Sequence, residues 1–424
     1  MKSRIKSIIE KGFFHIFGAN VLNKIIQFAN GIILVRLLTK EQFGLFSYAQ
    51  NILMLFLLFN GLGVNSGMLQ FGSETEDINK KNTFFHYGIK IGFTFNIFIS
   101  IIILLFTTMF TLKVDDARPI LKLMFLLPLF MFVLETIQIY LRSSLENKKF
   151  ALLSNLNTFA LFLCNVTGAY YFKVIGVVIF QYVAFGISII IGLYLIKNSI
   201  IGILKASELD SSLKKDFLKF SLIQLFNNAI SQMLYIIDIF IIGIIIVDET
   251  VIASYKTATL IPFALNFIPM SIMTFIYPYF AKNNKNKYWI KTNYLKLMKY
   301  LFVGNLFLSL FLILFAPLII TTLFGEQYSD AVVPFQILSI GYFIAATFRI
   351  PAGNILVMLR EVKFGLYLSI ITGVLNIILD IILIKFYGPI GAALATVSVF
   401  IFTSVIGVTY LLMKLKKNNK DEIL

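Results

Sequence analysis

Charged side chains are scarce in this sequence. They make up 14% of its 424 residues, against about 25% in an ordinary soluble domain, while hydrophobic residues reach 58%. So little charge excludes most soluble folds and favours a protein whose solvent is the lipid bilayer. A soluble protein with unusually apolar helices is the alternative that this composition disfavours.

Cysteine and nucleotide-binding signatures are also missing. Cys164 is the single cysteine and lies in an apolar run, which excludes a disulfide framework and is typical of a small buried hydrophobe. The sequence has no Gly-x-x-x-x-Gly-Lys-Ser/Thr loop and no soluble segment large enough to bind ATP. ATP-driven transport by this chain alone is therefore not expected.

Long apolar runs are abundant. Each is about 20 residues or more, enough for a helix to cross a hydrocarbon core of about 30 Å. We predict an all-α integral membrane protein with about 12 transmembrane helices. The predicted spans are 14–38, 44–70, 84–110, 119–141, 151–171, 174–196, 220–246, 251–281, 300–321, 331–359, 364–384 and 388–413.

The basic residues lie mainly on one side of these spans. The net charge is +16, which could suggest a nucleic-acid partner, but alternate loops carry 26 and five Lys or Arg residues. Loops rich in Lys and Arg stay in the cytoplasm. The distribution therefore predicts membrane orientation with both termini cytoplasmic, and no nucleic-acid partner.

The sequence repeats itself at an offset slightly above half its length. The matching segments are Leu45–Ala49 with Ala253–Ala258, whose Ser-Tyr pairs are 207 residues apart, Asp116–Ala117 with Asp330–Ala331 at 214, Leu145–Phe150 with Leu359–Phe364 at 214, and Ile175–Gly176 with Ile390–Gly391 at 215. Internal repeats of this kind are typical of transporters. We predict two pseudo-symmetric six-helix lobes, residues 1–196 and 220–424, joined by a cytoplasmic linker at 197–219.

Acidic and polar side chains inside the second lobe form the sharpest candidate site. Asp238 and Asp380 are both predicted roughly 7–15 Å below the outer surface, at 1.5 Å of helix per residue. Thr396 falls in the same layer, and Asn376 lies one turn from Asp380. These oxygens suit a small hard cation. A proton site and two unrelated helix contacts remain alternatives.

Basic side chains inside the spans point to an anionic substrate. Lys24 lies in the middle of span 14–38 on one face with Asn20 and Gln27, and Arg349 lies within span 331–359. Lys256 is nearer the end of its span, where a Lys side chain can reach the interface instead. Buried cations need water or a partner, so these are candidate substrate-binding residues.

Several short motifs carry a family resemblance over the whole chain. They are Leu38–Ala49, Pro269–Lys282, Phe324–Tyr328 and Gly388–Ala393. With them the sequence resembles an O-antigen or capsule-type polysaccharide flippase of the multidrug/oligosaccharidyl-lipid/polysaccharide exporter superfamily. The resemblance implies two lobes around a central cavity that opens alternately to each side of a bacterial inner membrane.

The resemblance also implies a sodium site. Lipid II flippases of this superfamily bind sodium in the carboxy-terminal lobe, and Asp238, Asn376, Asp380 and Thr396 match their ligands, with a backbone carbonyl from Ala392. The first-lobe positions equivalent to the two Asp residues are expected to be Gly31 and Val166. Those flippases also carry Arg on their second span, which has no basic residue in its interior here. This departure argues against lipid II as the substrate.

The predicted function is translocation of an undecaprenyl-pyrophosphate-linked oligosaccharide from the cytoplasmic to the outer leaflet by alternating access, coupled to Na⁺ or H⁺. The expected partners are this polyprenyl-linked glycan, membrane lipid and other polysaccharide-assembly membrane proteins. We expect no enzyme activity and no cofactor beyond a bound cation. A cation-coupled multidrug antiporter is the alternative. A membrane glycan polymerase is disfavoured because every predicted outer loop is short.

Overall fold

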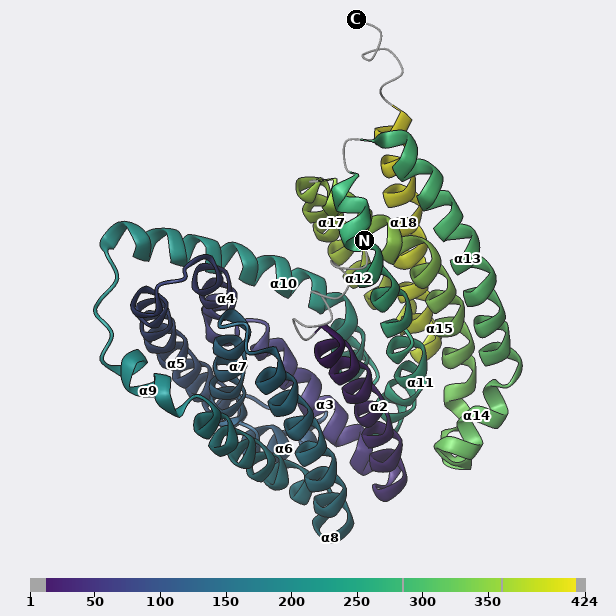
Figure 1. Cartoon of the computed structure of the whole chain (residues 1–424). Coiled ribbons are helices and arrows are strands. Elements are labelled where there is room, and N and C mark those ends of the chain that lie inside the picture. The colour runs from purple at the N-terminus through teal and green to yellow at the C-terminus, as the bar shows by residue number, and fades with distance from the viewer. Residues whose placement is uncertain (1–12, 284–285, 360, 417–424) are drawn as a thin grey trace, which may run out of the picture. The chain divides into compact units, whose positions relative to one another are not determined.

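The computed structural model describes residues 13–283, 286–359 and 361–416, and helices dominate this part of the chain (Figure 1). No strand occurs among these residues. The chain divides into two compact units, Met1–Met233 and Leu234–Leu424. The division falls within one helix, α10, and later than the predicted linker at 197–219, which contains a short helix of its own.

The first unit consists of helices that follow one another through short connections. They are α2 (Phe13–Leu37), α3 (Lys40–Leu57), η1 (Asn60–Gly63), α4 (Val64–Glu74), α5 (Ile78–Met109), η2 (Asp115–Ala117), α6 (Arg118–Leu123), α7 (Leu127–Ser143), α8 (Asn147–Leu195), α9 (Lys197–Leu204) and the first part of α10 (Ser211–Ile245). Helix α2 packs along α8, and α4, α5 and α7 pack together. Thr39 starts α3 with a capping box, in which its side chain and that of Gln42 accept from each other's backbone N–H.

The second unit begins within α10 and has the same kind of architecture. Its further elements are α11 (Glu249–Ala264), α12 (Phe267–Lys282), α13 (Lys287–Leu314), α14 (Ala316–Leu323), η3 (Glu326–Ala331), α15 (Val332–Ile344), η4 (Ala345–Arg349), α16 (Ile350–Met358), α17 (Val362–Tyr387) and α18 (Pro389–Lys416). Helix α18 packs against both α15 and α17. Asp248 caps α11 by accepting from the backbone N–H groups of Thr250 and Val251.

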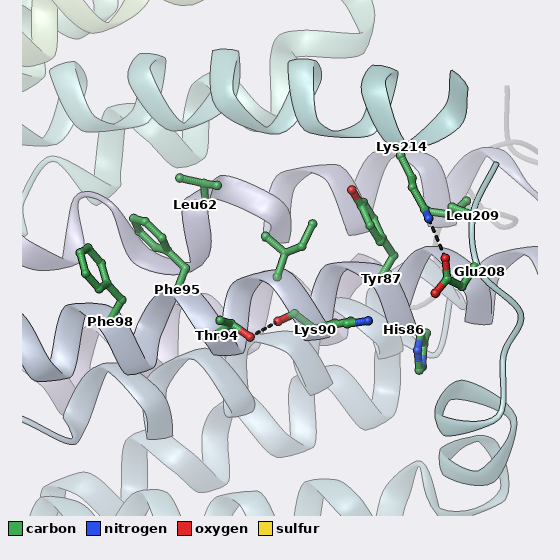
Figure 2. Close-up of a pocket in the computed structure, with 11 residues that line it drawn as sticks. Leu62, His86, Tyr87, Lys90, Thr94, Phe95, Phe98, Glu208, Leu209 and Lys214 are labelled. Atoms are coloured by element: carbon green, nitrogen blue, oxygen red, sulfur yellow. Dashed lines mark hydrogen bonds and ion pairs between the residues drawn. The ribbon is translucent and has the colours of Figure 1, made fainter. Parts of the chain in front are cut away.

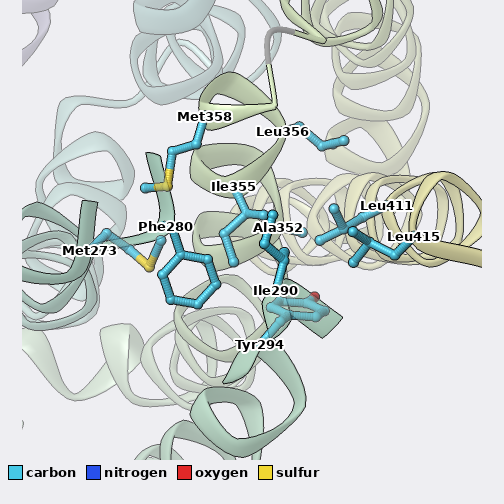
Figure 3. Packing of buried hydrophobic residues seen from close by; sticks show 10 residues of the cluster. All are labelled: Met273, Phe280, Ile290, Tyr294, Ala352, Ile355, Leu356, Met358, Leu411 and Leu415. Atoms are coloured by element: carbon cyan, nitrogen blue, oxygen red, sulfur yellow. The ribbon is translucent and has the colours of Figure 1, made fainter. Parts of the chain in front are cut away.

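A cluster of buried apolar residues fills one end of the second unit, between α12, α13, α16 and α18 (Figure 3). Phe280, Tyr294 and Ile355 lie near its centre, each at most 5% exposed. Elsewhere large apolar side chains face outward, as on α5, where Phe98 is 56% and Met109 is 72% exposed. Such exposure is tolerated where lipid surrounds the helix.

The all-α membrane fold is therefore confirmed. Eight helices are long and apolar enough to cross a bilayer, or up to ten if each of two bent pairs forms one span, within the described ranges. The number of twelve spans stays a prediction. Two predicted spans, 151–171 and 174–196, lie in α8, which Lys173 interrupts with φ 54° and ψ −138°.

This interruption recurs in the second unit. Gly388, between α17 and α18, has φ 58° and ψ −137°, and it lies 215 residues after Lys173. The neighbouring close approaches repeat at the same spacing: a Cβ on Gly176 would meet the carbonyl of Gly168, and one on Gly391 would meet that of Leu383. The two units thus share one tight turn between two antiparallel helices.

Candidate functional site

Asp238 on α10 lies at the centre of a buried polar cluster in the second unit. Its Oδ2 accepts hydrogen bonds from Tyr255 Oη of α11 at 2.5 Å and from Thr396 Oγ1 of α18 at 2.6 Å. All three residues are at most 3% exposed. Two consecutive helices, α10 and α11, and the distant α18 therefore bring their polar side chains to one point.

Asp380 on α17 completes the cluster. Its Oδ2 accepts from Asn376 Nδ2 at 3.1 Å, one helical turn earlier, and its side chain is fully buried. The carboxyl groups of Asp380 and Asp238 are close enough to interact with each other. The structure therefore brings these side chains together, where the sequence predicted Asp238, Asp380 and Thr396 at one depth and Asn376 one turn from Asp380.

Two buried carboxyl groups in contact cannot both carry an uncompensated charge. Each ionised group loses its hydration, and the two charges repel. The cost falls when one group holds a proton or when a cation lies between them. The pair therefore suits a proton or a metal cation.

The donor set fits a hard cation. Asp238 Oδ1 and Asp380 Oδ1 are buried, and neither has a hydrogen-bond partner among the described side chains and backbone. Ala392 is fully buried on α18, one turn before Thr396. The described residues contain no group of three or more His, Cys, Asp or Glu that could hold a metal. The chemistry is thus that of carboxylate and neutral oxygens, which hard ions such as sodium accept.

Sequence reasoning did not include Tyr255 among the site residues, although its hydroxyl makes the shortest contact with Asp238. A signal was present, because Tyr255 matches Tyr48 in the repeated segments at an offset of 207. Both tyrosines are 1% exposed, and a buried tyrosine usually needs a partner for its hydroxyl. The repeat indicated that the two tyrosines occupy equivalent positions. The helical phase of α10 could not predict which residue of α11 contacts Asp238.

Arg349 lies apart from the carboxylates in a distorted stretch of helix. The segment η4 is a turn of π-helix, and Pro351 follows it and lacks the N–H that a regular helix would use there. Arg349 donates from Nη1 to Tyr235 Oη at 3.0 Å, and its guanidinium lies 4.8 Å from the ring centre of Phe400. No carboxylate pairs with it among the described residues, so aromatic groups hold this cation.

The other predicted substrate residues lie on different helices. Lys24 is exposed on α2 and donates to Gln27 Oε1 at 3.4 Å. Lys256 on α11 is half-buried and adjoins Tyr255 in sequence, but it makes no hydrogen bond to the carboxylates in the described part of the unit. The side chain of Asn20 lies outside the part of the chain that the structure describes.

A cavity of about 640 Å³ in the first unit was not predicted (Figure 2). At one end Lys214 forms an ion pair with Glu208 at 2.8 Å, and Phe95 and Phe98 line the other end. The hydrogen bond from Lys214 lowers the pKa of Glu208, which lies in the loop before α10. The anionic partner already within this cavity makes it a weaker candidate for an anionic substrate.

Comparison with solved structures gives the fold independently. The lipid II flippase MurJ in an inward closed conformation matches with a TM-score of 0.77 and 18% identity, over 95% of this chain and 87% of that one. An inward-facing multidrug resistance MATE family transporter of the MOP superfamily matches with a TM-score of 0.73 and 15% identity, over 94% and 96%. A MOP superfamily transporter from Pyrococcus furiosus matches with a TM-score of 0.63 and 14% identity, over 97% of both chains.

Sequence comparison identifies the family. No curated protein sequence matches the chain. The family model described as "Polysaccharide biosynthesis protein" matches residues 9–284, which is more than half of the chain. The chain belongs to the polysaccharide biosynthesis protein family.

Proposed function

We propose that this protein is a cation-coupled flippase for an undecaprenyl-pyrophosphate-linked oligosaccharide, which it carries from the cytoplasmic to the outer leaflet of the bacterial inner membrane. The family match is to polysaccharide biosynthesis, and MurJ, which shares the fold, is a lipid II flippase. A lipid-linked glycan combines these two features. The substrate here is proposed to be an O-antigen or capsule precursor.

The buried Asp238–Asp380 pair is the observation that carries the coupling. The Oδ1 atoms of Asp238 and Asp380 have no partner among the described residues and are available to Na⁺ or H⁺. The site also joins four helices, because Asp238 of α10 bonds to side chains of α11 and α18 and Asp380 lies on α17. A cation that binds one conformation of these helices better than another shifts the equilibrium between them. We propose that the ion gradient resets the carrier in this way after each substrate is released.

The basic residues support an anionic substrate. Lys24 is exposed on α2, and the described residues leave Arg349 without a carboxylate partner. A pyrophosphate is expensive to remove from water, and positive side chains along its path lower that cost. The likeness to a MATE transporter would also allow a multidrug antiporter. Basic side chains along the path would repel the cationic drugs that such an antiporter carries.

The test is glycan display in cells that lack their own flippase, scored with an antiserum against the surface glycan. The wild-type protein is expected to restore display, and Asp238→Asn is expected to abolish most of it at equal membrane abundance. Asp116→Asn is the matched control, since Asp116 is exposed on η2 and should display normally. Repeating the assay with sodium replaced by potassium, and with the proton gradient collapsed, separates the two coupling ions.

Two results would count against the proposal. Normal display by Asp238→Asn would reject the coupling site. Failure of the wild-type protein with every glycan donor, together with resistance to cationic drugs, would favour the multidrug antiporter.

A further inference from the structure

The first unit contains a cavity of about 410 Å³ whose polar lining is almost entirely carboxamide. Its lining includes the amide residues Gln27, Asn30, Gln50, Asn157, Asn165 and Gln181 from α2, α3 and α8. None of the described residues that line it is charged. This volume is within the range of about 300–1,000 Å³ typical of small-molecule sites.

Three of the amide residues around this cavity have side-chain oxygens that accept no hydrogen bond from the described part of the chain. The side-chain oxygens of Asn30, Asn157 and Asn165 are buried and have no hydrogen-bond partner among the described residues. Asn165 is only 5% exposed, and it lines the cavity. A buried polar atom without a partner is costly, so these three oxygens leave hydrogen-bond acceptors unused in the helices around the cavity.

The cavity occupies the place in the first unit that the acidic cluster occupies in the second. The spacing of 215 residues, fixed by the turns at Lys173 and Gly388, makes Asn165 the equivalent of Asp380. The sequence expectation of Val166 is therefore wrong by one residue. The same spacing makes Gln181 the equivalent of Thr396.

On α2 the residue that lines the cavity is Asn30, next to the expected equivalent Gly31. It belongs to the helix that corresponds to α10, which carries Asp238. The repeat thus presents three amides where the second unit presents two carboxyl groups and a hydroxyl.

The lining offers an ionic ligand no counter-charge and suits a hydroxyl-rich ligand. A carboxamide offers two N–H donors and a carbonyl acceptor, which match alcohol groups that both donate and accept. Phe162 and Phe185 add aromatic surface to the same lining, which suits the C–H face of a sugar ring. Among the lining residues themselves, a cation would find no carboxylate and an anion would find no basic side chain.

We propose that this amide cavity binds an uncharged sugar residue of the transported glycan. The inference rests on the proposed function, which supplies a glycan as substrate. Lys24 donates to Gln27, which lines the cavity, so a positive charge lies beside the site. Lys24 is placed to contact the phosphate end of a substrate whose sugar occupies the amides.

The direct test is saccharide binding to the full-length protein in nanodiscs of phosphatidylethanolamine and phosphatidylglycerol. Saturation-transfer NMR measures the binding of glucose, galactose, rhamnose, N-acetylglucosamine and N-acetylgalactosamine, with glucuronate as the anionic comparator. At least one neutral sugar is expected to bind better than glucuronate. Asn165→Leu and Gln181→Leu should each weaken it about tenfold, the effect of one lost hydrogen bond in a buried site. Gln70→Leu, which removes an exposed amide on α4, should bind normally.

Thermal stability separates ligand binding from a structural role. Because the Asn165 oxygen has no partner in the described protein, Asn165→Leu is expected to keep or raise Tm. If the amides only join helices, the Leu variant lowers Tm and leaves saccharide binding unchanged, which overturns the proposal. Binding of no neutral sugar by the wild-type protein also overturns it.

Transport data distinguish the failure of this inference from failure of the flippase assignment. Normal glycan display with no saccharide binding rejects the amide cavity alone. Asp238→Asn should retain saccharide binding while losing display, since it removes coupling from the other unit. Preferential binding of tetraphenylphosphonium over every sugar would reject the cavity assignment and favour the drug antiporter.

Discussion

The two units use one backbone arrangement for two kinds of polar chemistry. At the turn shared by Lys173 and Gly388, the first unit places Asn165 and Gln181 where the second places Asp380 and Thr396. Amides stay neutral and need no counter-ion, whereas buried carboxyl groups require a proton or a cation. A duplicated scaffold can therefore assign recognition to one unit and energy coupling to the other.

Removing the acid should have the largest effect on transport. Asp380→Asn keeps the size of the side chain but removes the second charge that binds a cation. We expect the rate of glycan translocation to fall by about 100-fold, within the range of allosteric coupling energies. Asn165→Leu should reduce the rate less and should keep its dependence on the ion gradient.

Translocation in inverted vesicles, measured with and without an imposed sodium or proton gradient, checks this contrast. Equal loss of gradient dependence in both variants would contradict the assignment of recognition to the first unit and of ion coupling to the second. Unchanged transport by Asp380→Asn would remove the coupling site altogether.

Placing the acid in the other unit should reduce stability. Asn165→Asp puts a carboxyl group into the amide cavity, where no basic residue lines the wall. An isolated buried carboxyl avoids the full cost of its charge by binding a proton, so we expect a loss of about 2 kcal/mol at pH 7. Unfolding in detergent, followed by tryptophan fluorescence of Trp289, measures it. The reverse exchange at Asp380 should not lower stability, because it relieves the contact between two acids.

Hydropathy was enough to predict the helical membrane fold, and helical spacing singled out Asp238, Asn376, Asp380 and Thr396, whose side chains the structure brings together. Both signals depend only on spacing along one helix. Tyr255 and the amide cavity depend on which helices lie side by side, which no single-helix pattern encodes. Asn165 was missed for a narrower reason, since an offset of 214 instead of 215 rotates the equivalent position by about 100° around the helix.

The break in α8 was also foreseen only in part. The sequence predicted two spans on either side of Lys173, but Lys is not a residue that marks a turn with positive φ. Gly388 followed by Pro389 is the usual signal, since Gly allows the turn and Pro favours the first position of the next helix. The first unit makes the same turn without that signal.

This difference predicts opposite responses at the two turns. Gly388→Ala should destabilise by about 2 kcal/mol, because a side chain strains the backbone at φ 58° although the nearest neighbouring atom is 3.8 Å away. Lys173→Gly should stabilise by about 1 kcal/mol, since the relief of strain exceeds the entropy cost of Gly. The same unfolding assay measures both. Destabilisation by Lys173→Gly would mean that the hydrogen bond from Lys173 Nζ to the Leu37 carbonyl, at 3.4 Å, outweighs the strain.

The smallest effect on stability is expected from removing the carboxylate that precedes α8 in the first unit or α17 in the second. Glu361 pairs with Lys414 of α18 at 2.8 Å and accepts from Tyr410 Oη, so the hydrogen bond from Lys414 lowers the pKa of Glu361 from 4.5. Its equivalent 215 residues earlier, Glu146, pairs only with Lys149, three residues away, at 2.5 Å. The first pair joins two helices, whereas the second is local.

A carboxyl group whose pKa is lowered by folding stabilises the protein above the unfolded pKa and loses that contribution as pH falls through the folded value. Glu361→Gln should therefore lower Tm by about 1 °C at pH 7, the scale of an exposed ion pair, and by progressively less as the pH falls below 4.5. The difference should shrink in 1 M salt. Glu146→Gln is the matched control and should change Tm less, because the ion pair that it removes is local and joins no second helix. Equal shifts for the two variants would show that the cross-helix pair adds no stability beyond a local one.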